Sequence, residues 1–148
     1  MSGMFFKATT FNGDIGSWDV SNVTDMRSLF SGASNFNTDL NDWNVSNVTN
    51  MNGMFQDATL FNSDLNNWDI TNVDNIAFIF ERATSFNGDI SNWNVGNIIN
   101  MSGFFVAASS FNQDISGWAT ENVMFCFDFS TNSALIPAHL PTAGNCDF

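Results

Sequence analysis

Apolar positions along the chain follow a 25-residue pattern that recurs without an insertion from residue 1 to about residue 125. In the second unit, Met26, Leu29, Phe30 and Ala33 stand at positions i, i+3, i+4 and i+7, and the same steps begin again at residues 51, 76 and 101. This spacing makes one apolar stripe of a helix. We therefore expect a short helix near residues 25–33 of each unit. A polar side chain that can cap free amides precedes each stripe: Asp25, Asn50, Asn75 and Asn100.

The segment before each stripe has a different period. Trp18 and Val20 alternate with Ser17 and Asp19, which indicates a short strand near residues 18–20. Such a unit buries its apolar face only by stacking on its neighbours. Because strands stack about 4.8 Å apart and helices pack about 8–10 Å apart, the helix side of the stack is expected to be the longer one.

These patterns predict an α/β repeat solenoid, a curved array with strands on the concave side and helices on the convex side. Residues 1–125 make about five turns with one strand and one helix each. The columns fail at Cys126, so residues 126–148 are expected to form a C-terminal cap. The abrupt start in the middle of a unit suggests that the natural protein continues upstream.

Three columns are expected to form structural ladders inside the stack. Burial is expected for the aromatic columns, although exposed tryptophans that stack on sugar rings are an alternative. Buried amides that bond across turns are expected for the asparagine column. The columns are Phe11, Phe36, Phe61, Phe86 and Phe111; Trp18, Trp43, Trp68, Trp93 and Trp118; and Asn22, Asn47, Asn72, Asn97 and Asn122.

The repeat also resembles a known family. The run from Phe36-Asn37-x-Asp39-Leu40-x-x-Trp43 to Met54-Phe55-x-x-Ala58 is similar to the 25/26-residue repeat of bacterial surface proteins and lipoproteins, which is related to the BspA-like leucine-rich repeats. The resemblance covers residues 1–125. It implies a leucine-rich-repeat-like fold, export and a role in surface display or adhesion. It implies no enzyme activity and no catalytic residue.

Charge narrows the choice of partners. The chain carries 15 acidic and 3 basic residues, for a formal net charge of −12. Three basic residues cannot form the patch that binding to phosphates requires, so we expect no nucleic-acid partner. No apolar stretch approaches the roughly 20 residues of a membrane-spanning helix.

Two kinds of residue suggest a covalent or metal-dependent role. Cys126 and Cys146 are expected to form a disulfide that stabilises the cap by about 3 kcal/mol in an oxidising compartment, with two buried free thiols as the alternative. A column of aspartates is expected to accept backbone N–H bonds at its own corners, and a calcium ladder is the other interpretation. The column is Asp14, Asp39, Asp64, Asp89 and Asp114.

The outward positions beside the expected strand are the natural binding face. They are small, polar and acidic, and they lack the aromatic and arginine anchors of most protein interfaces. The candidate face consists of Ser17, Asp19, Asp42, Asn44, Asn67, Asp69, Asn92 and Asn94.

We expect a non-enzymatic surface or secreted repeat module for adhesion or protein–protein interaction, extracellular or attached to a cell surface, with an unknown protein or glycan partner. One alternative is a structural spacer or self-assembling element that associates end to end through Met1, Met4 and Phe5. A remote alternative is an ice- or glycan-binding solenoid, with ice contacting the hydroxyl column Thr9, Ser34, Thr59, Thr84 and Ser109.

Overall fold

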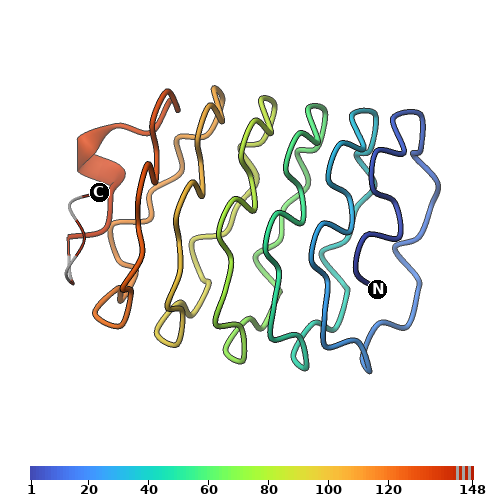
Figure 1. Ribbon diagram of the computed structural model, residues 1–148, viewed down its shortest axis with the longest axis horizontal. Helices are drawn as coiled ribbons and strands as arrows, with labels where there is room; N and C mark the ends of the chain where they lie inside the picture. The colour runs from blue at the N-terminus through green and yellow to red at the C-terminus, as the bar shows by residue number, and fades with distance from the viewer. Residues whose placement is uncertain (143, 145, 147) are drawn as a thin grey trace.

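The computed structural model describes residues 1–142, 144, 146 and 148. The chain winds into a row of stacked coils, with the N-terminus at one end of the row and the C-terminus at the other (Figure 1). Residues that are 25 positions apart lie side by side in consecutive coils, as a run of parallel β-bridges shows. The bridges are Asp25–Asn50, Asn50–Asn75, Asn75–Asn100 and Asn100–Phe125. The 25-residue repeat predicted from the sequence is therefore confirmed.

The predicted secondary structure is wrong. Within the described residues, the only helix is the 3₁₀ helix η1 (Pro137–His139). Neither the helix near residues 25–33 nor the strand near residues 18–20 forms, and parallel pairing is limited to isolated bridges. The coils are thus built from consecutive turns, and the molecule is not a leucine-rich-repeat-like α/β array.

Backbone hydrogen bonding explains why residues 26–33 are not a helix. The N–H groups of Met26, Ser28 and Phe30 donate to carbonyl oxygens of the following coil at 2.9–3.0 Å. Between them, the N–H groups of Leu29 and Ser31 donate to the carbonyl three residues earlier, at 3.2 Å in both cases. An α-helix requires each N–H to bond within its own segment, to residue i−4. Here every second N–H bonds to the neighbouring coil instead.

We call this segment the turn ribbon, and its copies span residues 1–8, 26–33, 51–58, 76–83, 101–108 and 126–133. Two residues of each ribbon, four positions apart, have left-handed backbone conformations, such as Ser28 (φ 52°) and Gly32 (φ 75°). The apolar stripe still faces the core, because Met26, Leu29 and Ala33 are fully buried. The burial prediction was therefore right although the helix was wrong.

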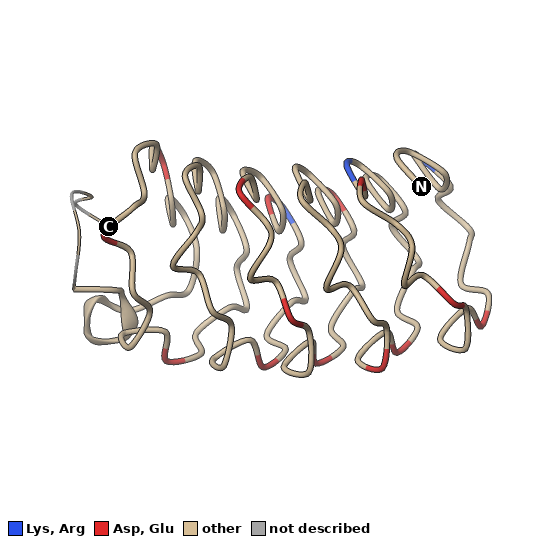
Figure 2. Ribbon diagram, turned by 90° about the horizontal axis from the view of Figure 1, so that it is seen from below, with Lys and Arg blue, Asp and Glu red and all other residues tan. Residues whose placement is uncertain are grey.

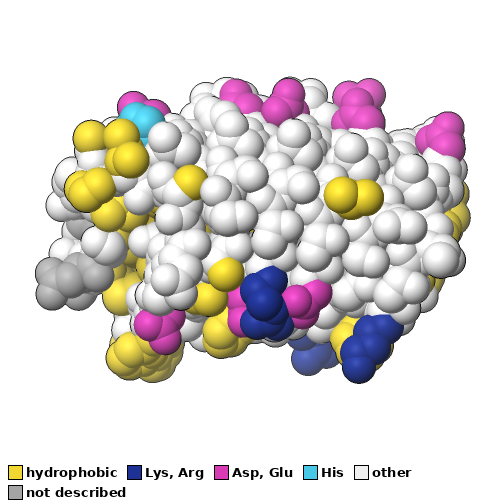
Figure 3. Space-filling model, turned by 90° about the horizontal axis from the view of Figure 1, so that it is seen from above, with side chains coloured by type: hydrophobic (Ala, Val, Ile, Leu, Met, Phe, Trp, Pro, Cys, Tyr) yellow, Lys and Arg dark blue, Asp and Glu magenta, His cyan; other side chains and the backbone are white. Residues whose placement is uncertain are grey.

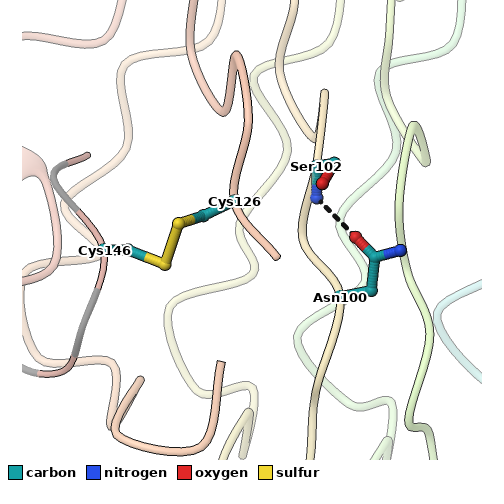
Figure 4. Close-up of a disulfide and its surroundings, with 4 residues drawn as sticks. All are labelled: Asn100, Ser102, Cys126 and Cys146. Atoms are coloured by element: carbon teal, nitrogen blue, oxygen red, sulfur yellow. Dashed lines mark hydrogen bonds between the residues drawn. A yellow bond between two sulfur atoms is a disulfide. The ribbon is translucent and has the colours of Figure 1, made fainter. Parts of the chain in front are cut away.

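The polar residue before each ribbon does cap an amide, but the amide belongs to a turn. The Oδ1 atom of Asn100 accepts the Ser102 N–H at 3.0 Å (Figure 4), and that of Asp25 accepts the Arg27 N–H at 3.0 Å. Asn50 and Asn75 make the same bond.

The expected strand is absent because its amides bond locally. The N–H of Trp18 donates to the Ile15 carbonyl at 3.0 Å, and that of Val23 donates to the Val20 carbonyl at 2.9 Å. Side chains connect the coils here instead. The indole Nε1 of Trp43 donates to the Ile15 carbonyl at 3.0 Å, and the same bond recurs from Trp68 and Trp93.

Ring stacking fills the core. The rings of Phe30 and Phe36 lie 4.0 Å apart within one coil, and Phe36 lies 5.9 Å from Phe61 in the next coil. On the other aromatic ladder, Trp68 and Trp93 are separated by 6.3 Å. The ladders thus have similar spacings, and no helical layer lengthens one side. The predicted concave strand face and convex helix face are accordingly absent.

The described residues after position 125 follow the path of a sixth coil. The Ile115 N–H donates to the His139 carbonyl at 3.1 Å, and Leu140 continues the column of Ile15. Phe148 stands 25 residues after Val123 and packs against Phe129, with ring centroids 4.6 Å apart. A disulfide joins Cys126 to Cys146 and closes this last coil (Figure 4).

Candidate interaction surface

One long edge of the stack carries the predicted binding face. All eight of its residues are exposed, in two rows that run from coil to coil. They lie on or beside the turns at residues 16–17 and 21–22 and their counterparts. We call this surface the acidic edge and include in it the aspartate column that begins at Asp14. Figure 2 shows acidic residues recurring along this edge from one end of the stack to the other.

Local hydrogen bonds hold the side chains of the acidic edge in place. Asp19 accepts the backbone N–H of Ser21 at 3.0 Å and its hydroxyl at 2.6 Å. Asn44 makes the same pair of bonds with Ser46 in the next coil. The hydroxyl bond of Ser21, followed by the backbone bond, lowers the pKa of Asp19. Asp69 has a lowered pKa for the same reason, with Thr71 as the donor.

The aspartate column accepts backbone bonds, as the first interpretation proposed. Asp39 accepts the Asn41 N–H at 2.9 Å, and Asp89 accepts the Ser91 N–H at 2.9 Å. Asp14 and Asp114 bond in the same way, whereas Asp64 accepts the Asp89 N–H of the next coil. Nowhere in the described part of the chain do three or more His, Cys, Asp or Glu side chains gather as metal ligands would. Four of the five carboxylates thus accept an N–H of their own turn, and Asp64 links two coils.

The cations lie on the opposite edge of the stack. Arg27 pairs with Asp25 at 2.7 Å, and Arg82 pairs with Asp57 at 2.6 Å and with Glu81. Lys7 lies over the Phe6 ring, 5.1 Å from its centroid. Figure 3 shows this separation, with the basic side chains along one border and a row of acidic side chains along the other. Among the described residues, the acidic edge therefore contains no lysine or arginine, although the imidazole of His139 lies near Asp114.

The asparagine column bonds across coils as predicted, but it is not buried. The Nδ2 atom of Asn47 donates to the Ser21 carbonyl at 2.8 Å, and that of Asn72 donates to the Ser46 carbonyl at 2.7 Å. Asn97 and Asn122 repeat the bond, yet all five asparagines of this column are exposed. A second column, which sequence reasoning did not single out, acts as an acceptor. Oδ1 of Asn12 accepts the Asn37 N–H at 2.9 Å.

The tryptophan column, considered as a surface for sugar rings, lies mostly in the core, and the hydroxyl column, considered as a surface for ice, bonds to neighbouring coils. Trp43, Trp68, Trp93 and Trp118 are each only 3% exposed, and Trp18 at the N-terminal end is 42% exposed. In the hydroxyl column, Thr59 Oγ1 donates to the Ser34 carbonyl at 3.2 Å, and Thr84, Ser34 and Ser109 make equivalent bonds. These hydroxyl hydrogens are thus directed at the neighbouring coil. No pocket opens among the residues that the structure describes.

The feature that sequence reasoning missed is the turn ribbon. Its signal was present, because glycines occupy the left-handed columns at Gly3, Gly53 and Gly103 and again at Gly32. Glycine inside an apolar helical stripe is unfavourable, whereas it suits a left-handed turn. The other occupants of these columns include Asp57, Asp128 and Asn132, residue types that tolerate the same conformation.

The fold and its surface define a repeat protein of stacked coils with one coil per 25-residue unit. The chain belongs to the family described as "Mycoplasma protein of unknown function, DUF285", whose model matches residues 1–87 and 64–134. This match shows no link to the BspA-like leucine-rich repeats. Neither curated proteins nor solved structures give a match. No helix in the described part is long and apolar enough to cross a membrane.

Proposed function

We propose that this chain is a non-enzymatic repeat module, secreted or displayed at a cell surface, that binds a protein partner through its acidic edge. The observation that carries the proposal is the arrangement of charge. Carboxylates recur in register along one edge, and Lys7, Arg27 and Arg82 all lie on the other. Complementary charge steers association and selects partners. The partner's matching surface is accordingly rich in lysine and arginine.

Two properties support this role. Asp19, Asp69 and four members of the aspartate column are held by their own turns, so less conformational freedom is lost on binding than with mobile side chains. The Cys126–Cys146 disulfide favours an oxidising compartment, since cytosolic thiols are normally kept reduced. The resemblance to bacterial surface repeats points to the same location.

The test is a screen of the oxidised chain against protein and glycan arrays, followed by titration of each hit. The edge variant carries Asp19→Asn, Asp42→Asn and Asp69→Asn. It removes three charges but keeps the side-chain oxygens with which residues 19 and 69 accept their turn bonds. A matched control carries Asp25→Asn, Asp57→Asn and Asp128→Asn, which makes the same change in net charge away from this edge.

We expect a basic protein to bind, with affinity that falls as salt increases. At about 0.5 kcal/mol per exposed charge, the edge variant loses roughly tenfold in affinity. The control variant remains close to the parent chain. Equal losses in both variants would show that net charge alone drives binding. If a neutral glycan were the only tight ligand in the screen, the partner would be a sugar and not a protein.

A further inference from the structure

Asparagine followed by glycine occurs in two different environments of the stack. Before glycine, the side-chain amide of asparagine is readily reached by the next backbone nitrogen, because glycine has no Cβ to hinder the approach. Asn12 and Asn87 belong to the column whose side chains accept backbone N–H groups across coils, whereas Asn52 lies in a turn ribbon. The pairs are Asn12-Gly13, Asn52-Gly53 and Asn87-Gly88.

The glycine nitrogen is free in two of these pairs and engaged in the third. Neither the Gly13 N–H nor the Gly88 N–H makes a hydrogen bond within the described part of the chain. By contrast, the Gly53 N–H donates to the Ala77 carbonyl of the next coil at 2.9 Å. Attack by the Gly53 nitrogen on the preceding side chain therefore requires that a bond between two coils is broken first.

The side-chain carbonyl that would be attacked is polarised in the same two pairs. Oδ1 of Asn87 accepts the Asn112 N–H at 2.9 Å, just as Oδ1 of Asn12 accepts that of Asn37. When a nitrogen adds to an amide carbon, negative charge develops on this oxygen, and a backbone N–H directed at it stabilises that charge. Among the described residues, the side chain of Asn52 receives no such bond.

Solvent access also differs between the two environments. Asn12 and Asn87 are exposed, so water reaches their side chains, whereas Asn52 is half-buried. A free nucleophile, a polarised carbonyl and access to water thus coincide at residues 12 and 87, and none of the three is fully present at residue 52.

We propose that Asn12 and Asn87 are sites of spontaneous deamidation in the folded protein and that Asn52 is protected. The nitrogen of the following glycine loses its proton to solvent and adds to Cγ. The side-chain nitrogen takes up a proton and leaves as ammonia, so that a succinimide ring remains. Water then adds to one of the two ring carbonyls and opens the ring, which gives aspartate or isoaspartate. The reaction consumes one water and releases one ammonia, without an oxidant or a reductant.

Each conversion adds charge to the acidic edge. Asn12 and Asn87 stand two residues before Asp14 and Asp89, so the new carboxylate lies next to the aspartate column. The modification itself does not depend on what the acidic edge binds.

Close packing restricts the product at position 87. An aspartate keeps an oxygen that accepts the Asn112 N–H, and it leaves the backbone unchanged. Isoaspartate inserts one more atom into the backbone beside Gly88, where a Cβ would already lie 2.3 Å from the Ser63 carbonyl oxygen. The aspartate form is therefore the one that the coil accommodates.

The test is peptide mapping by mass spectrometry after incubation of the oxidised 148-residue chain at mildly alkaline pH, with samples taken over several weeks. A parallel incubation in concentrated urea is the unfolded control, because every glycine nitrogen is then free. Thr38→Gly creates a new pair in the same column, since Oδ1 of Asn37 already accepts the Asn62 N–H at 2.8 Å. Circular dichroism establishes that this variant is folded.

We expect Asn12 and Asn87 to convert at least about fivefold faster than Asn52 in the folded chain, which is the rate equivalent of the one backbone hydrogen bond that protects Gly53. In urea, the three sites convert at similar rates. Asn37 persists in the folded parent chain and converts in the folded Thr38→Gly variant.

Equal rates at the three sites of the folded chain would mean that conversion takes place only through unfolded molecules, and this result would overturn the proposal. Two other results would also overturn it. One is that Asn12 and Asn87 persist in the folded chain while the unfolded chain is converted, and the other is that Asn37 persists in the folded Thr38→Gly variant.

Discussion

At the residue scale, the coils are joined by side chains that bond to the backbone of a neighbouring coil. Tryptophan illustrates this, because the same indole donor recurs in three coils while the ring fills the core. Trp118 is equally buried, but its Nε1 has no hydrogen-bond partner among the residues that the structure describes. Comparing Trp118 with a hydrogen-bonded tryptophan such as Trp68 therefore separates the contribution of the buried ring to stability from that of the indole hydrogen bond.

Substituting Trp68→Phe is expected to destabilise the chain more than Trp118→Phe. Both changes remove buried ring volume, but only the first removes a hydrogen bond, at 2.8 Å to the Leu40 carbonyl. The difference in the free energy of unfolding should be about 1 kcal/mol. Urea denaturation followed by tryptophan fluorescence measures both variants. Equal losses of unfolding free energy in the two variants would mean that the indole hydrogen bond makes no net contribution to stability.

At the element scale, the turn ribbon replaces the expected helix, and the two structures respond oppositely to the same substitution. In a helix, alanine is more favourable than glycine by about 1 kcal/mol. In the ribbon, Gly53 is left-handed with φ 61°, a conformation that costs an alanine about 1–2 kcal/mol. The sign of the change in stability therefore identifies the structure.

We expect Gly53→Ala to destabilise the chain by about 1–2 kcal/mol, since its new Cβ meets nothing closer than Gln56 Oε1 at 3.5 Å. Gly103→Ala should cost more, because there the Cβ would lie 2.3 Å from the Phe78 ring. Chemical denaturation of both variants measures these costs. An increase in stability for Gly53→Ala would indicate a helix at this position.

The sixth coil is the element whose closure depends on a covalent bond. Cys126→Ser with Cys146→Ser is expected to lower the stability of this coil by about 3 kcal/mol. Hydrogen exchange should then rise first in residues 126–142, while the second and third coils keep their protection. Thiol titration of the unreduced chain should find no free thiol. Titration of two thiols in the folded, unreduced chain would contradict the disulfide.

At the scale of the whole molecule, the net charge of −12 and its uneven distribution determine the response to pH. Hydrogen bonds lower the pKa of Asp19, Asp69 and Asp114, mainly from the side chains of Ser21, Thr71 and Ser116. Asp25 has a lowered pKa mainly because of its bond with Arg27. A carboxylate with a lowered pKa stabilises the folded state above its unfolded pKa, and that stabilisation is lost as the pH falls.

We expect the unfolding free energy to be nearly constant between about pH 7 and 5 and to decrease below about pH 4, where these aspartates take up protons. The decrease should be modest, because the carboxylates are largely solvated. Thermal unfolding at a series of pH values measures it. A stability that rises steadily below pH 4 would show that relief of acidic repulsion outweighs the lost hydrogen bonds.

The sequence by itself determined the period, the buried columns and the exposed acidic residues, because these depend on which side chains recur every 25 positions. Phe36, Trp43 and Met26 are buried as their columns predicted, and Asp19 and Asp42 are exposed. Only the tertiary structure decided the backbone of each coil. A spacing of i, i+3, i+4 and i+7 specifies which side chains share a face, but it does not specify where their N–H groups bond. In this stack a neighbouring coil lies close enough to accept every second N–H, and that competition replaces a helix by a ribbon of turns.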